Sequence, residues 1–367
     1  MTANAILLDR AVDHAIDELR FERGVVYRMI AVLNRADARF VAALSEALLQ
    51  IEPGSFTVER LEALLQSSRA LEYNLQAYRD TFAALEPELR AAAEAEARYQ
   101  AAALRNAVPA AVQLQFPIAA IAPEQVYAAA LSRPFQGRLL SGWAQAMPAA
   151  RMAQVREAIR AGYVAGETTA DIIRKIRGTK ALRYEDGILA RLRRDLATIV
   201  QTALSHTAQT ARQLSYDANA DLIKALRWVS TLDNRTSPMC RVRDGLQYTA
   251  TSPHKPVGGH HVPWGDGPGR LHLNCRSVSV PVLKSWRELG IDADELPAST
   301  RASMDGAVPA DLTYSQWLAR QSPERQDEIL GPERGKLLRA GKVKIEQFTD
   351  DKGNWLTLDQ LRAKIGT

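Results

Sequence analysis

The first 105 residues contain little glycine or proline and much alanine, as in the stretch AAAEAEARYQAAAL. Alanine loses no side-chain entropy on entering a helix, so this composition favours helix over sheet. Apolar residues recur at helical spacing, as at Val25, Met29, Val32 and Leu33. The sequence therefore predicts an elongated N-terminal helical arm, and no residue pattern in it is typical of a catalytic site.

The next part of the chain predicts a connector followed by a helical hairpin. Residues 106–124 are apolar but interrupted by prolines, which favour an extended backbone. A helix is expected from near Pro148 to Gly166, since glycine commonly ends helices. A second helix is expected to begin after Thr168, whose side chain would cap it, and to stop at Gly178.

The periodicity changes after a long helix expected at residues 186–218. Alternating apolar residues predict a strand at 226–232, with Leu226, Trp228 and Leu232 on one face. A loop rich in Gly, Pro and His is expected at 246–270, and a second short strand follows at 277–283. Together these elements predict a small α+β unit.

The C-terminal part is mixed. Ser322 and Pro323 are expected to start a helix as its cap and first residue. Residues 343–348 are expected to form a strand, and Thr357 to cap a last helix. The fold expected for the whole chain is mainly α with a small α+β domain. Its expected segments are the arm at 1–105, the connector and hairpin at 106–185, the α+β domain at 186–285 and the mixed segment at 286–367.

Charge and cysteine content narrow the functional classes. The net charge of +5 is small, and its densest cluster, RLRR at 191–194, is typical of a solvated helix face. Two cysteines argue against a secreted disulfide framework, and the opening MTANAILLDRAVDH lacks the pattern of a signal peptide. The apolar stretch 101–122 contains arginine and prolines, so no membrane span is expected. No P-loop, dinucleotide fingerprint or G-x-S-x-G motif occurs in the sequence.

The most informative segment combines ALRWVSTLDNRTSPMCRVRDG with a later LHLNCRSVSVPV. It resembles the phage Mu F-like head morphogenesis domain. In that family a Trp-bearing strand leads into an Asp-x-Arg-Thr-Cys-x-x-Cys turn with Asp-Gly beyond it, and a His-x-x-Cys-Arg-Cys element closes the domain. The resemblance extends over about residues 130–285, and less closely over the C-terminal segment. The matching residues are Trp228, Asp233, Arg235, Thr236, Cys240, Asp244, Gly245, His272, Asn274, Cys275 and Arg276.

The resemblance implies a non-enzymatic minor structural protein of a tailed-phage head. Such a protein would be assembled in the host cytoplasm and kept in the virion near the portal vertex. It would aid head assembly, DNA packaging or delivery. The implied partners are the portal protein or the major capsid protein, and packaged double-stranded DNA bound without sequence preference. No membrane partner is implied.

This chain departs from the family's cysteine pattern. Ser237 and Ser277 stand where members with two cysteine pairs have thiols that could clamp zinc. Serine hydroxyls stay protonated at neutral pH and are poor zinc ligands. A site would need Cys240, His272, Cys275 and one of His254, His260 or His261. The favoured interpretation is that the two cysteines are neighbouring buried thiols, with no metal and no cofactor.

Two further interpretations remain open. His260, His261, His272 and Asn274 loosely resemble the residues of a metal-dependent HNH nuclease, although no histidine follows His272 to supply a ligand from a later helix. The second open interpretation is a DNA-binding ejection protein carried in the capsid. Within the motif, Asp244 and Arg276 are expected to form an ion pair that holds the loop to the turn.

Overall fold

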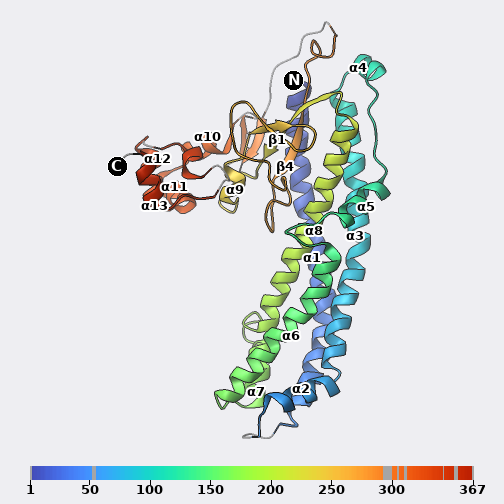
Figure 1. The fold of residues 1–367 in the computed structure, drawn as a ribbon, viewed down its shortest axis with the longest axis vertical. Helices are drawn as coiled ribbons and strands as arrows, with labels where there is room; N and C mark the ends of the chain where they lie inside the picture. The colour runs from blue at the N-terminus through green and yellow to red at the C-terminus, as the bar shows by residue number, and fades with distance from the viewer. Residues whose placement is uncertain are drawn as a thin grey trace. The chain divides into compact units, whose positions relative to one another are not determined.

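The computed structural model describes residues 2–51, 55–291, 300–303, 306–309, 312–341, 343–350 and 354–365. These residues form two compact units, each built from separate parts of the sequence. Unit 1 comprises residues 1–20, 92–130 and 205–367, and unit 2 comprises residues 21–91 and 131–204. These units cut across the consecutive segments expected from the sequence, because three long helices each contribute residues to both units. Those helices are α1 (Ala3–Leu48), α3 (Ala70–Ala107) and α8 (Ile188–Ala218) (Figure 1).

Unit 2 is helical. Besides its parts of the three long helices it contains α2 (Val58–Ser67), α6 (Leu140–Val164) and α7 (Thr169–Arg177). Its core is apolar and includes Phe40, Leu44, Leu61, Val155, Ile172 and Leu196. A buried ion pair joins Arg151 to Asp37 at 2.7 Å. The expected cap of α7 is confirmed, since the Thr168 hydroxyl accepts from the Asp171 amide.

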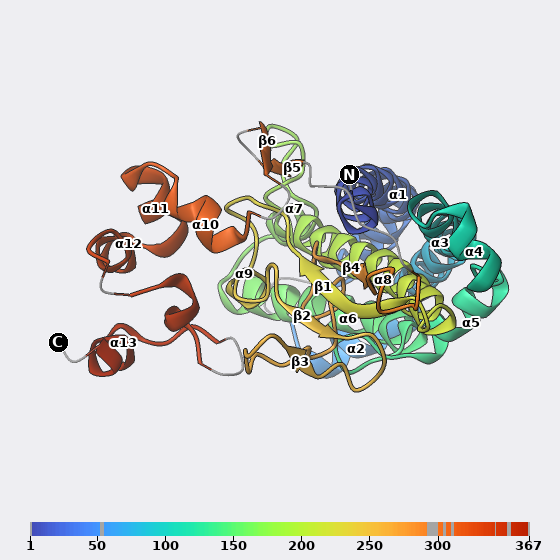
Figure 2. The same ribbon diagram turned by 90° about the horizontal axis from the view of Figure 1, so that it is seen from above.

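Unit 1 contains the β-strands of the described chain. Strand β1 (Ile223–Val229) pairs antiparallel with β2 (Gln247–Thr249) on one side and β4 (Val278–Leu283) on the other, and β3 (Pro256–Val257) pairs with β2. The resulting order is β3-β2-β1-β4 (Figure 2). Helix α8 packs on β4, where the Tyr216 hydroxyl donates to the Ser279 carbonyl at 2.9 Å. A second pair, β5 (Thr300–Ser303) and β6 (Gly306–Pro309), forms a separate hairpin.

The remaining elements of unit 1 are short helices. Helices α4 (Ala110–Gln115) and α5 (Pro123–Ser132) follow α3 along the chain, and α9 (Pro238–Arg241) follows β1. The C-terminal elements are α10 (Tyr314–Ala319), α11 (Pro323–Leu330), α12 (Pro332–Arg339), the 3-10 helix η1 (Ile345–Phe348) and α13 (Leu358–Ile365). They enclose a separate apolar cluster that includes Trp317 and Phe348. The expected fold class, mainly α with a small α+β domain, is confirmed.

Several local expectations were wrong. The connector contains helix α4 and is not extended throughout. Helix α6 starts at Leu140 with Pro148 inside it. The Pro148 carbonyl accepts from the buried Asn74 side chain at 2.9 Å, so tertiary packing supports the helix around the proline.

The sheet and the C-terminal part also differ from expectation. The Gly/Pro/His loop contains the short strands β2 and β3, because the edge of β1 provides pairing partners for β2. Residues 343–348 include the helical turn η1 where a strand was expected. Strand β1 ends at Val229, so Leu232 leaves the face of Trp228 and joins the C-terminal apolar cluster. The Ser322 and Thr357 caps are confirmed. Part of the expected C-terminal segment lies outside the described residues.

Candidate functional site

The motif residues gather around one end of the four-stranded sheet in unit 1. Trp228 lies on β1 and is fully buried. The edge of its ring system meets Trp264 with centroids 5.4 Å apart, and its indole N–H donates to the Ser230 hydroxyl at 3.2 Å. A buried tryptophan needs such a partner for its polar N–H. Trp228 thus anchors the strand from which the motif turn leaves.

Asp233 organises the turn after β1. Its Oδ1 accepts from the amides of Arg235 and Thr236 and from the Thr236 hydroxyl, each at 3.0 Å. The Arg276 guanidinium donates to both Asp233 oxygens, at 2.6 and 2.7 Å. Partial burial opposes ionisation, but the Arg276 hydrogen bonds and charge prevail and lower the pKa of Asp233. The carboxylate therefore ties the turn to the residues before β4.

The expected ion pair between Asp244 and Arg276 was wrong. Asp244 instead accepts from the Ser230 amide and the Tyr314 amide, each at 2.7 Å. It therefore joins the end of β1 to the start of α10. Gly245 beside it has φ +81°, and a Cβ there would lie 2.9 Å from the Thr313 side chain. Sequence reasoning missed Tyr314, because nothing local indicates that the C-terminal part packs on this turn.

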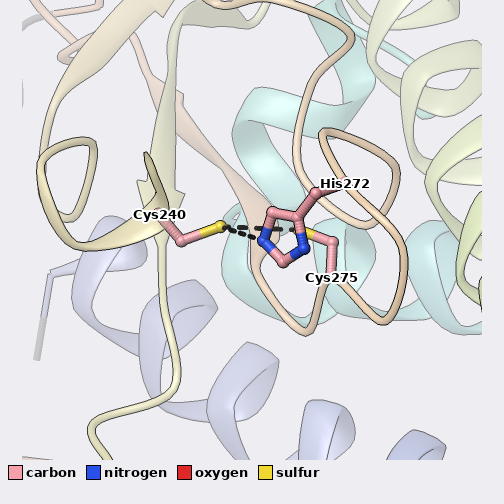
Figure 3. A group of neighbouring side chains, drawn as sticks. All are labelled: Cys240, His272 and Cys275. Atoms are coloured by element: carbon pink, nitrogen blue, oxygen red, sulfur yellow. Dashed lines mark hydrogen bonds between the residues drawn. The ribbon is translucent and has the colours of Figure 1, made fainter. Parts of the chain in front are cut away.

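Cys240 comes from the turn after β1, and His272 and Cys275 come from the segment before β4. The three side chains meet at one point (Figure 3). The Cys240 and Cys275 sulfurs are 3.6 Å apart, and the His272 Nε2 lies 3.2 Å from the Cys240 sulfur. The Ser237 hydroxyl lies 2.7 Å from the same Nε2. Both cysteines are buried and free. The structure thus brings the three candidate metal ligands into one cluster, with their ligand atoms within 4.8 Å of one another.

The thiols of this cluster differ in acidity. The hydrogen bond from Cys240, assisted by that of His272, holds the pKa of the Cys275 thiol well below its ordinary value, although burial opposes this. The same hydrogen bond to Cys275, together with burial, raises the pKa of Cys240. Burial disfavours the His272 cation, but its contact with Cys275 outweighs this and raises the pKa of His272. Cys275 is therefore the more acidic of the two thiols.

The other histidines of the loop lie apart from this cluster. The His260 Nε2 lies 2.8 Å from the Gln247 carbonyl, and its ring meets the Tyr248 ring. The His254 Nδ1 lies 2.9 Å from the Thr249 carbonyl. Within the described residues, the groups with metal-ligand geometry include none of His254, His260 and His261. The chain beyond Asn274 enters strand β4, so the helix of an HNH arrangement does not follow.

Residues 153–280 match the family model described as phage Mu protein F like protein. The chain carries a phage Mu F-like domain. The match includes all of the motif residues, from Trp228 to Arg276. No curated protein and no solved structure matches the chain. None of the helices in the described ranges is both long and apolar enough to cross a bilayer.

Beside the sheet of the Mu F-like domain, helix α8 carries one side of a buried ionic cluster that the sequence did not reveal. Arg212 lies 2.5 Å from Glu18 and 2.9 Å from Glu96, and His14 lies 2.6 Å from Glu96. Burial opposes ionisation of Glu96, but Arg212 and His14 lower its pKa to about 2. The spacing of His14 and Glu18, one turn apart on a helix, was the only local signal. The single Arg212 charge balances one ionised carboxylate, that of Glu96, while burial raises the pKa of Glu18 well above its ordinary value. The cluster therefore links helices α1, α3 and α8.

Proposed function

We propose that this protein is a minor structural component of a tailed-phage head, with a role near the portal vertex in head assembly, DNA packaging or DNA delivery. The match of residues 153–280 to the phage Mu protein F like family carries the proposal. Assembly in the host cytoplasm and retention in the virion follow from that role. The partners proposed are the portal protein or the major capsid protein.

The contacts of the motif support a structural role over an enzymatic one. Backbone amides donate hydrogen bonds to both Asp233 and Asp244, and Arg276 also donates to Asp233. Neither carboxylate is therefore directed at a substrate. A cavity of about 510 Å³ lies in unit 2, and its lining residues on and between α1, α2 and α3 include no motif residue. General acid–base catalysis needs a group within hydrogen-bond reach of a bound substrate. The motif geometry fits a scaffold.

Contact with packaged DNA is proposed as sequence-independent and weak. The net charge of +5 favours nucleic acid only mildly. In the RLRR stretch, Arg193 lies 3.4 Å from Asp37 and Arg194 lies 3.7 Å from Glu185, while Arg191 donates to Gln154. These contacts partly neutralise the cluster. Binding to DNA is therefore expected to weaken with added salt and to show no sequence preference.

Complementation tests the proposal. A phage with an early stop codon in this gene is expected to give few infectious particles, and the full chain supplied in trans should restore them. Mass spectrometry of purified particles should detect the chain in full heads. A normal yield of infectious particles without the chain would overturn the proposal. Loss of the chain from emptied particles would favour the ejection protein.

A nicking assay separates the scaffold from a nuclease. The purified chain with Mg²⁺ or Zn²⁺ is expected to leave supercoiled plasmid intact. His260→Ala should complement as well as the native chain, because His260 contacts only neighbouring loop and strand residues in the described structure. Plasmid cleavage that disappears in His260→Ala or His272→Ala would contradict a structural role.

A further inference from the structure

Two tight turns face each other at the end of the sheet and present their side chains to a common point. In the first, the Cys240 amide donates to the Ser237 carbonyl at 3.0 Å. In the second, the Cys275 amide donates to the His272 carbonyl at 3.2 Å, and Asn274 adopts φ +58°. Each turn therefore places two side chains three residues apart on the same side. Paired turns of this spacing are how small zinc sites hold four ligands.

The distances between the ligand atoms are close to those of a zinc tetrahedron. Bonds of about 2.3 Å to sulfur and 2.05 Å to nitrogen give edges of about 3.8 Å between sulfurs and 3.6 Å between sulfur and nitrogen. The observed distances are 3.6 Å between Cys240 and Cys275 and 3.2 Å between Cys240 and His272. Shifts of a few tenths of an ångström in these side chains would bring the ligand atoms to the distances of a zinc tetrahedron. A disulfide, by contrast, needs about 2.05 Å between sulfurs.

The His272 ring is oriented as a ligand would be. Its Nδ1 lies 2.8 Å from the Leu273 carbonyl, which can only accept a hydrogen bond. In the neutral ring this contact places the proton on Nδ1, and the lone pair of Nε2 is then directed at the Cys240 sulfur and the Ser237 hydroxyl. A hydrogen bond from the remote ring nitrogen to a backbone carbonyl is the usual support for a metal-binding histidine.

We infer that this cluster binds one thiophilic divalent cation of the zinc class through the sulfurs of Cys240 and Cys275 and the Nε2 of His272. The Ser237 hydroxyl or a water molecule would complete the tetrahedron. Binding releases the remaining thiol protons, so affinity falls as the pH falls. This inference differs from the expectation of no metal made from the sequence, because the structure brings the three candidate ligands together.

The site would act as a clamp within the Mu F-like domain. Cys240 lies on the helical turn α9 after β1, and Cys275 lies just before β4. An ion held by both would fix the ends of two paired strands. The weak fourth ligand, Ser237, makes the affinity lower than that of a site with three cysteines and one histidine.

Metal content and cobalt spectra of the full chain test the inference. Purified under reducing conditions from zinc-supplemented cells, the chain is expected to hold one zinc per molecule. Co²⁺ should give thiolate charge-transfer and tetrahedral d–d absorption bands. The double variant Cys240→Ser and Cys275→Ser should lose both signals, whereas the matched control His254→Gln should keep them. Loss of a direct ligand should exceed the roughly 10–100-fold weakening typical of outer-shell changes.

A gain-of-ligand variant keeps the test independent of folding defects. Ser237→Cys supplies a third thiolate and should tighten zinc binding in competition with a chelator, with stronger charge-transfer absorption. The inference is overturned if the native chain, with its thiols reduced, binds neither zinc nor cobalt in stoichiometric amount. It is also overturned if the cobalt bands persist in the double cysteine variant, since the ion would then lie elsewhere.

Discussion

The pair of Asp233 and Arg276 predicts a specific coupling energy in the Mu F-like domain. We expect Arg276→Met, Asp233→Asn and their combination to form a double-mutant cycle with a clear non-additive term. Asparagine keeps an oxygen for the turn amides of Arg235 and Thr236, so the cycle isolates the contact with Arg276.

The magnitude follows from geometry and burial. Arg276 makes two charge-assisted hydrogen bonds to Asp233, at 2.6 and 2.7 Å, with side chains 19% and 20% exposed. Exposed ion pairs contribute about 0.2–1 kcal/mol, and hydrogen bonds to charged groups contribute about 1.5–3 kcal/mol. Since solvent still reaches a fifth of each side chain, we expect a coupling of about 1.5 kcal/mol, at the lower end of the second range.

Urea unfolding followed by tryptophan fluorescence measures this coupling. All tryptophans except Trp143 belong to unit 1, so the signal reports mainly on the unit that contains the pair. The pH dependence gives a second readout. Because the pKa of Asp233 is lowered in the folded state, the pair stabilises above the ordinary aspartate value of 3.8, and this contribution is lost as the pH falls through the lowered pKa.

The matched control uses Asp244, which accepts from the Ser230 and Tyr314 amides. Asp244→Asn combined with Arg276→Met should be additive within about 0.5 kcal/mol. A larger coupling of Arg276 to Asp244 than to Asp233 would refute the arrangement described.

Three further outcomes are expected. Arg212→Met leaves the buried carboxylate of Glu96 without its cation and should lower the free energy of unfolding by about 3–5 kcal/mol, measured by urea unfolding. Because the pKa of Glu96 is lowered to about 2, its stabilising contribution is complete above the ordinary value of 4.5 and is lost as the pH falls from there to about 2. Glu96→Gln should therefore flatten the acid unfolding profile over that range, and an unchanged profile would contradict the assignment. Gly162→Ala places a Cβ 2.4 Å from the Ile172 side chain and should cost about 1–3 kcal/mol. Ile172→Ala removes this clash but opens a core cavity, so the double variant should lose less stability in thermal unfolding than the sum of the two single losses.

The sequence by itself determined several helix caps and the motif turn. Thr168, Ser322 and Thr357 cap the helices expected of them, and Asp233 bonds the amides just after it. These features depend on residues within a few positions, because helix caps and turns are closed by short-range hydrogen bonds. The resemblance to the Mu F-like family rested on the same local pattern.

Only the tertiary structure decided which distant groups meet. It paired Arg276 with Asp233, where the sequence had indicated Asp244, and it joined Asp244 to the Tyr314 amide. It also converted part of the loop into β2 and β3. The periodicity of the sequence indicates which face of a helix or strand is apolar. It does not indicate the partner of a buried charge or of a strand edge, because that partner lies tens of residues away in the sequence.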